Sequence, residues 1–233
     1  MSVLKYNLSR LKGKIIAIDG PAGSGKSTTA RLLAAALGYK YLDTGAMYRA
    51  LTHFALSRRI EPADGAKLTV LARTLPMEFI TEHDTNHVII NGVDVTTEIR
   101  SPEVTRHVSE VSAHKGVREA MVAKQRDMGK KGSIVVEGRD TTTVVFPNAD
   151  IKFYMDASVK ERAQRRLLDL IKLGESPVLE EVMADIERRD AHDSGRRHSP
   201  LKRASDAYVV DTTNMTIEDQ VEHMISLIKS VIK

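Results

Sequence analysis

The chain has 233 residues, of which 42% are hydrophobic, 28% are charged and seven are proline, so it has the composition of a globular domain and not of a disordered chain. It contains no cysteine, and its N-terminal stretch has no apolar run suited to a signal peptide or a membrane span, so we expect a cytoplasmic protein that does not enter a membrane. The formal net charge of +4 favours a partner that carries phosphate, but it does not choose among nucleic acid, membrane surface and nucleotide.

The N-terminal part begins with a lead-in, residues 1–13, to which we assign no function. An apolar run at Ile15–Asp19 predicts a strand. After a glycine-rich turn, apolar residues recur at helical spacing over residues 27–37, and Gly38 ends that helix. A second strand is predicted at Tyr39–Leu42. The predicted order is therefore strand, loop, helix, strand.

The next segment departs from this alternation. Three short runs have strand character, and they are Met77–Thr81, His87–Ile90 and Val93–Val95. The last two are separated by Asn91 and Gly92, a pair that is typical of a tight hairpin turn. The sequence therefore predicts a small antiparallel insert.

The rest of the chain alternates helices and strands again. Ser101 and Pro102 begin a helix, and three more strands are predicted at Ile134–Val136, Ile151–Met155 and Ala207–Val210. Three further helix starts are indicated by a capping box at Ser158 and Glu161, by Ser176 and Pro177, and by Thr216. Together these elements predict an α/β fold, a five-stranded parallel sheet with helices on both faces.

A phosphate-binding motif lies between the first strand and the first helix. The residues GPAGSGKS satisfy the pattern GxxxxGK[ST], and glycines let the backbone N–H groups and the helix N-terminus face a phosphate. Lys26 is expected to bridge the β- and γ-phosphates, and Ser27 to bind Mg²⁺. The ATP-binding residues predicted from this P-loop are Gly20, Pro21, Ala22, Gly23, Ser24, Gly25, Lys26, Ser27 and Thr28.

Three further polar segments follow predicted elements. LDTGAMYRALT (residues 42–52) and EGRDTTTVVFP (residues 137–147) come at the ends of strands, and such ends meet at one edge of a parallel sheet, beside the P-loop. The basic stretch at residues 188–203 is interrupted by acidic residues and contains no aromatic residue, so it is less typical of a single-strand nucleic-acid surface than of a basic lid that clamps phosphate.

In order and spacing, the P-loop and these three segments resemble the cytidylate kinase family, from about residue 15 to the C-terminus. The resemblance implies a P-loop nucleoside monophosphate kinase fold and transfer of the γ-phosphate of ATP, with Mg²⁺, to CMP or dCMP. It also implies a monomer. The organisation expected is one domain at 14–233, with a core at 14–60, 116–175 and 204–233, an NMP-binding insert at about 61–115 and a lid at about 176–203.

The resemblance assigns the acceptor site residue by residue. Arg49, Arg139 and Arg196 match arginines that grip the acceptor phosphate, for which guanidinium forks are well suited. Asp140 matches the residue that faces the amino group of cytosine, and Arg118 the one that faces its acceptors, so uracil would turn a carbonyl toward the carboxylate. The other CMP contacts implied are Thr44, Tyr48, Ser109, Arg189 and Asp193.

The resemblance assigns the donor side, the metal and the chemistry less completely. The adenine-side arginines fall on Arg162 or Arg165, and Asp43 and Glu137 are possible contacts of the Mg²⁺ hydration shell. No side chain is expected to form a phosphoenzyme, so transfer is direct and depends on positioning and charge neutralisation. The residues expected to act on the transferring group are Lys26, Arg139, Arg189 and Arg196.

Two positions depart from the family pattern. Glu137 stands where the family commonly has aspartate, which keeps a carboxylate that is one methylene longer. Thr142 stands where the family commonly has glycine, and we expect it to place a hydroxyl and a methyl group near the acceptor pocket. The second change could alter the preference among pyrimidine nucleotides.

Three other functions remain open from the residues alone. Another kinase of this scaffold could act on AMP, UMP, dTMP or shikimate, and Ser109, Arg118 and Asp140 discriminate against it. A P-loop GTPase or regulatory ATPase that works through partners is disfavoured because the sequence has no NKxD motif. An RNA-binding protein is disfavoured by an aromatic content of 4% and by the acidic residues of the lid, so we expect no nucleic-acid partner.

Overall fold

The structure is a computed structural model that describes residues 11–82, 85–172 and 174–232. Its main sheet is built from β1 (Ile15–Asp19), β2 (Lys40–Asp43), β6 (Ile134–Gly138), β7 (Ile151–Asp156) and β8 (Tyr208–Asp211). The strand order is β2-β6-β1-β7-β8, and every neighbouring pair is parallel. The predicted five-stranded parallel sheet is confirmed.

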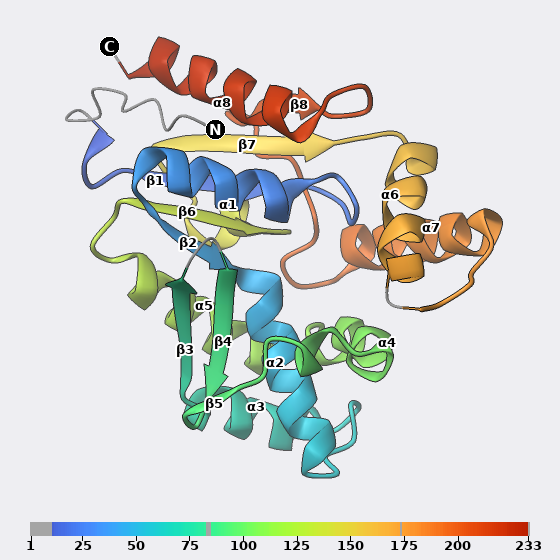
Figure 1. The fold of residues 1–233 in the computed structure, drawn as a ribbon. Helices are drawn as coiled ribbons and strands as arrows, with labels where there is room; N and C mark the ends of the chain where they lie inside the picture. The colour runs from blue at the N-terminus through green and yellow to red at the C-terminus, as the bar shows by residue number, and fades with distance from the viewer. Residues whose placement is uncertain (1–10, 83–84, 173, 233) are drawn as a thin grey trace.

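Helices cover both faces of this sheet, as predicted (Figure 1). The helices are α1 (Lys26–Leu37), α2 (Thr44–Ser57), α3 (Gly65–Thr74), α4 (Pro102–Val111), α5 (Lys115–Gly129), α6 (Val159–Lys172), α7 (Leu179–Gly195) and α8 (Ile217–Val231). Alternate residues of β6 show the two layers: Val135 packs in the cluster of α1 and α8, whereas Ile134 and Val136 pack in the cluster of α2 and α5. No helix in the described part of the chain is both long enough and apolar enough to cross a membrane.

The predicted antiparallel insert is present as a second, three-stranded sheet. Its strands are β3 (Met77–Glu82), β4 (Thr85–Ile90) and β5 (Val93–Asp94), paired in that order. Asn91 and Gly92 join the last two strands with φ values of 50° and 78°, the left-handed backbone that a tight hairpin turn requires. Two short elements lie near the acceptor segments, the 3₁₀ turn η2 (Glu98–Arg100) and the π-helical turn η3 (Thr141–Val145).

Helix α3 has no counterpart among the predicted elements. Its N-terminus is capped by Asp64, whose carboxylate accepts a hydrogen bond from Lys67 N at 3.0 Å. Its buried residues are Leu68, Leu71 and Ala72, and the helix packs against α5. The apolar stripe is short, so the N-cap aspartate was the clearer signal in the sequence.

Helices α6 and α7 form a separate layer beside the sheet (Figure 1). They pack through a small apolar cluster that includes Ala163, Val182 and Ile186. Helix α7 begins at Leu179, two residues after the predicted start, and continues to Gly195, so the first part of the basic stretch is helical. The segment predicted as a lid, 176–203, therefore contains a helix followed by an irregular segment.

The expectation of a capping box before α6 is corrected, and Leu11 adds an observation on the N-terminal lead-in. The capping box before α6 is only half formed: Ser158 Oγ accepts from Glu161 N at 3.2 Å, but the Glu161 carboxylate accepts from Arg165 Nε at 2.9 Å. The N-terminal lead-in lies outside the described residues up to residue 10, but Leu11 is buried in the core cluster of α1 and α8. The packed part of the chain thus begins before residue 14.

Candidate active site

The glycine-rich loop between β1 and α1 folds back on itself. A Cβ atom on Gly20 would lie 1.9 Å from the carbonyl oxygen of Met155, so only glycine fits there. Lys26 is 5% exposed, and its Nζ donates to the carbonyl oxygen of Pro21 at 2.7 Å. Burial, together with the positive charge of Arg139, lowers the pKa of Lys26 to about 7. The lysine is therefore held inside the loop and close to a second cation.

Ser27 is held by a carboxylate from the neighbouring strand. Its Oγ donates to Glu137 Oε1 at 2.7 Å, and Tyr41 OH donates to the same oxygen at 3.3 Å. Glu137 is 3% exposed. Burial and the negative charge of Asp43 raise the pKa of Glu137, whereas the charge of Lys26 opposes them. The longer side chain of glutamate thus reaches the P-loop hydroxyl directly.

Asp43 supplies the second carboxylate at this edge, because it lies opposite Glu137 in the pairing of β2 with β6. It caps α2 by accepting from Ala46 N at 2.8 Å, and it accepts from Arg49 Nη2 at 2.7 Å. Burial opposes ionisation, but the guanidinium of Arg49 and the N–H of Ala46 outweigh it and lower the pKa of Asp43. Arg49 is thereby aimed at the edge that carries the P-loop.

The residues at this edge fit Mg²⁺ bound mainly by nucleotide oxygens and water. Within residues 11–82, 85–172 and 174–232, no group of three or more histidine or acidic side chains could enclose a metal ion. A hydroxyl from Ser27 and the carboxylates of Asp43 and Glu137 meet there instead, with one contact of 2.7 Å joining hydroxyl and carboxylate. Mg²⁺ in phosphoryl-transfer sites commonly keeps several waters and uses few protein ligands.

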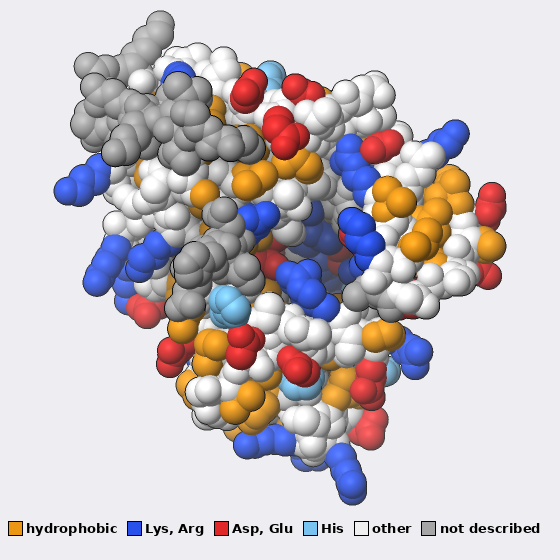
Figure 2. Space-filling model, in the orientation of Figure 1, with side chains coloured by type: hydrophobic (Ala, Val, Ile, Leu, Met, Phe, Trp, Pro, Cys, Tyr) orange, Lys and Arg blue, Asp and Glu red, His pale blue; other side chains and the backbone are white. Residues whose placement is uncertain are grey.

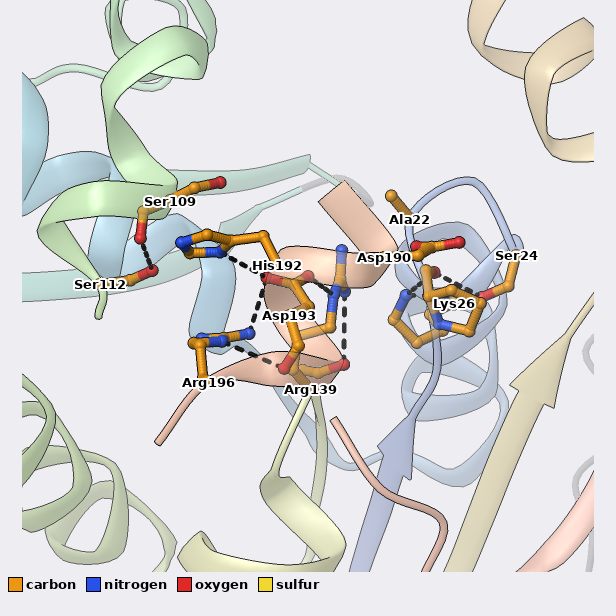
Figure 3. A network of polar contacts seen from close by, with 12 residues as sticks. Ala22, Ser24, Lys26, Ser109, Ser112, Arg139, Asp190, His192, Asp193 and Arg196 are labelled. Atoms are coloured by element: carbon orange, nitrogen blue, oxygen red, sulfur yellow. Dashed lines mark hydrogen bonds and ion pairs between the residues drawn. The ribbon is translucent and has the colours of Figure 1, made fainter. Parts of the chain in front are cut away.

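A buried aspartate joins the sheet to the lid. Asp193 of α7 accepts from Arg139 Nε and from Arg196 Nη2, each at 2.8 Å, and Figure 3 shows it between the two guanidinium groups. Burial opposes ionisation of Asp193, but Arg139 and Arg196 outweigh it and keep its pKa low. The structure thus brings together three residues that the sequence placed in the acceptor site.

A second buried ion pair lies beside the first. Arg118 Nη2 of α5 contacts Asp140 Oδ2 at 2.5 Å, and both side chains are almost fully buried. The guanidinium also donates to the carbonyl oxygen of Ser112 at 3.2 Å and stands 5.3 Å from the ring centre of Tyr48. A carboxylate and a guanidinium fixed side by side offer both an acceptor and donors to a flat heterocycle.

A cavity of about 460 Å³ opens between α4 and helices α6 and α7. Figure 2 shows a hollow that contains Lys and Arg side chains, bounded by the core, the insert and the lid. Ser109 and Arg189 line this cavity together with further arginines, Arg100, Arg106, Arg166 and Arg188. Burial and the charge of Arg139 lower the pKa of Arg189, so this lid arginine stands close to the cationic centre.

The two arginines expected on the adenine side behave differently. Arg162 is buried and donates to the carbonyl oxygen of Ala22 at 3.1 Å and to Asp190 Oδ2 at 2.6 Å. Arg165 is partly exposed and donates to the carbonyl oxygen of Thr212 at 2.7 Å. Arg162 of α6 therefore holds the P-loop through its hydrogen bond to Ala22. The side chain of Arg165 is the more exposed of the two and is the one that a ligand could reach more easily.

Two of the remaining sequence-predicted residues, Thr44 and Tyr48, are buried at the sheet edge. Thr44 Oγ1 donates to the carbonyl oxygen of Glu137 at 2.8 Å, and Thr44 is buried with Tyr48 near the carboxyl ends of β2 and β6. By contrast, the lid cations Arg197, Lys202 and Arg203, to which no role is assigned, are exposed to solvent.

The expectation for Thr142 is corrected. This residue is buried, and its Oγ1 donates to Asp19 Oδ2 at 2.5 Å, so the hydroxyl faces the sheet instead of the acceptor pocket. Asp19 was not among the predicted site residues. An acidic residue at the end of an otherwise apolar strand, directly before the glycine loop, was the signal that could have identified it.

A glycine loop after the first strand of a parallel sheet, with a second, arginine-rich site at the same edge and a basic lid, defines a P-loop phosphotransferase. The family model described as cytidylate kinase matches residues 16–230, and the chain belongs to this family.

Relatives of known name are similar over nearly their whole length. A protein named cytidylate kinase from Citrifermentans bemidjiense is 48% identical over 220 residues, which cover 94% of each chain. One of the same name from Bacillus cytotoxicus is 45% identical over 218 residues, which cover 94% of this chain and 97% of the relative. A crystal structure of an uncharacterized protein from Eubacterium ventriosum is 12% identical with a TM-score of 0.51, covering 94% of this chain and 99% of that one, and it supports the fold alone.

Proposed function

We propose that the P-loop and the arginine-rich edge hold ATP and a cytidine monophosphate end to end. As a member of the cytidylate kinase family, the chain transfers the γ-phosphate of ATP to CMP or dCMP, giving ADP and CDP or dCDP. The observation that carries the arrangement is the place of Arg139. Arg139 directly follows β6, whose last residue, Gly138, pairs with Asp19 at the end of β1. The positive charge of Arg139 also helps to lower the pKa of Lys26 in the P-loop.

On the acceptor side, we assign the phosphate of CMP to Arg49, Arg139 and Arg196. Each guanidinium is already oriented by a carboxylate, Asp43 for the first and Asp193 for the other two. A bound phosphate dianion would replace part of these contacts with charge-assisted hydrogen bonds of similar geometry. Ribose would then lie near Asp193 and Arg189 at the lid.

The base is assigned to the Arg118–Asp140 pair, with Ser109 as an added polar contact at the cavity. The carboxylate accepts from the amino group of cytosine, and the guanidinium donates to the ring nitrogen and carbonyl. Uracil presents a carbonyl where cytosine presents its amino group, so the same carboxylate would repel it.

Transfer needs no general base, because an oxygen of the acceptor phosphate is already ionised near neutral pH. Lys26 and the guanidiniums of Arg139, Arg189 and Arg196 surround the position where charge is redistributed between donor and acceptor. They neutralise that charge, and closure of α7 over the site excludes water. The rate is then supplied by in-line positioning and electrostatics.

Mg²⁺ is assigned to Ser27 directly and to Asp43 and Glu137 through water, where it would neutralise the phosphate oxygens of ATP. We expect Glu137→Gln to raise the Mg²⁺ concentration needed for half-maximal rate and to lower kcat, each by about tenfold, because outer contacts of a metal typically have this weight. Glu137→Asp, which keeps the charge, is the matched control, and a titration of initial rate against free Mg²⁺ is the measurement. Equal Mg²⁺ dependence of both variants and the parent would contradict the assignment.

The acceptor preference tests the base assignment. With Mg-ATP, the protein is expected to phosphorylate CMP and dCMP much faster than UMP, AMP or dTMP in a coupled assay of ADP release. Asp140→Asn should lower kcat/KM for CMP by about tenfold or more and narrow the preference over UMP, because an amide can donate to a carbonyl. The KM for ATP is the internal control and should change little. Equal turnover of UMP by the parent protein would remove the role given to Asp140.

Two further expectations belong to this proposal. They are a cytoplasmic location, where ATP is available, and a monomeric state. Light scattering of the purified protein checks the second, and a mass of one chain, 25.8 kDa, is expected.

A further inference from the structure

Asp19 is a buried acid that none of the roles above uses. It is the last residue of β1, it directly precedes the P-loop, and its exposed fraction is 0%. Its carboxylate accepts four hydrogen bonds, from Thr141 N at 2.8 Å and Oγ1 at 2.7 Å, and from Thr142 N at 2.7 Å and Oγ1 at 2.5 Å. Burial raises the pKa of Asp19, and the four donors oppose that effect. Burying a carboxylate costs free energy, and the four hydrogen bonds that offset this cost also hold Thr141 and Thr142 against the end of β1.

The four donors belong to the start of a helical turn. Residues Thr141–Val145 form a π-helical turn, closed by hydrogen bonds from Val144 N at 2.9 Å and Val145 N at 3.1 Å to the carbonyl oxygen of Asp140. The first N–H groups of a helical turn have no partner within it. Asp19, at the end of β1, accepts hydrogen bonds from those N–H groups, so its carboxylate caps a turn that follows a different strand, β6.

This cap lies between the two halves of the site. On one side, Asp19 is followed by Gly20, the first residue of the P-loop. On the other side, Thr141 is preceded by Asp140, whose carboxylate is paired with Arg118 at 2.5 Å. The capped contact is therefore directly adjacent in the chain to the ATP loop on one side and to the group assigned to cytosine on the other.

We propose that Asp19 is a positioning residue that, through Thr141 and Thr142, holds Asp140 at the angle required to accept from the cytosine amino group. The inference rests on the proposed role of Asp140. Arg118 fixes the carboxylate end of Asp140, and the capped turn fixes its backbone, so both ends of that residue are held. The hydroxyl of Thr142 supplies one of the four hydrogen bonds of the cap, and glycine at that position would supply only its N–H.

Thr142→Val is the primary test, since valine has the shape of threonine and leaves the Asp19 carboxylate in place beside Lys26. It should raise the KM for CMP by about tenfold, the scale of one hydrogen bond to a charged group, and reduce the CMP over UMP preference in proportion. The KM for ATP should change by less than about twofold. The hydroxyl of Thr142 is proposed to position Asp140 at the acceptor site, and it is given no role in ATP binding. Thr142→Ser, which restores the hydroxyl, should return the CMP parameters to those of the parent protein.

Asp19→Asn is the stronger variant, because its amide turns an NH₂ group toward N–H donors, and it should exceed the effect of Thr142→Val on CMP. Melting temperatures are recorded for all variants. A lowered melting temperature with unchanged CMP over UMP preference in both variants would overturn the inference, as would equal increases of KM for CMP and ATP. If Asp140→Asn itself leaves the preference unchanged, the proposed base assignment fails; if it shifts the preference and Thr142→Val and Asp19→Asn do not, only the role of Asp19 fails.

Discussion

Replacing Lys26 with alanine is expected to lower kcat by about 10²- to 10³-fold, the weight of a preorganised group that stabilises transition-state charge. The ammonium is enclosed by the P-loop, 2.7 Å from the carbonyl oxygen of Pro21, and it stands near the cation of Arg139. No other lysine is buried in that loop among the described residues. Steady-state kinetics with saturating Mg-ATP and CMP measure the effect.

Lys202→Ala is the matched control, because Lys202 is an exposed cation of the lid and its loss should change kcat by less than about twofold. Circular dichroism and melting temperature should show that the Lys26→Ala variant keeps its fold, since Glu137, whose pKa the charge of Lys26 helps to lower, keeps its hydrogen bonds from Ser27 and Tyr41. A variant that keeps more than half of the parent kcat would contradict the assignment of Lys26.

Arg139→Ala is expected to lower kcat/KM for CMP by about 10²- to 10³-fold, the range for loss of one preorganised donor to a reacting anion. The guanidinium follows β6, lies beside the P-loop and donates to Asp193 of the lid at 2.8 Å. Its loss therefore removes the contact proposed for the acceptor phosphate and the hydrogen bond that connects this segment to α7. Both kcat and KM for CMP should change, whereas KM for ATP should change less.

Arg197→Ala, at an exposed lid position, is the control for Arg139→Ala and should have parent kinetics. Arg139→Lys keeps the charge but loses the planar fork, so it should recover only part of the rate. Full recovery in the lysine variant would show that charge alone matters at this position. Parent kinetics in Arg139→Ala would contradict the arrangement proposed for the acceptor phosphate.

Most of the fold is readable in the sequence because each strand is a short apolar run and each is followed by a turn or helix signal. Ile134–Val136, for example, predicted a strand, and the structure extends that strand by two residues, to Gly138. Helix α3 was missed because its stripe covers three buried residues, Leu68, Leu71 and Ala72, which is too short to stand out. Packing against α5 supplies the stabilisation that local pattern does not.

The sequence by itself determined the P-loop, because that motif is local, whereas the arginines and acids proposed for the acceptor edge were assigned by the resemblance to the cytidylate kinase family. The tertiary structure alone decided which charges pair, since Arg139 meets Asp193 of the lid and Arg118 meets Asp140 only after the sheet and α7 are assembled. It also decided the direction of Thr142, whose hydroxyl turns to Asp19 because a buried carboxylate must find donors wherever the fold brings them.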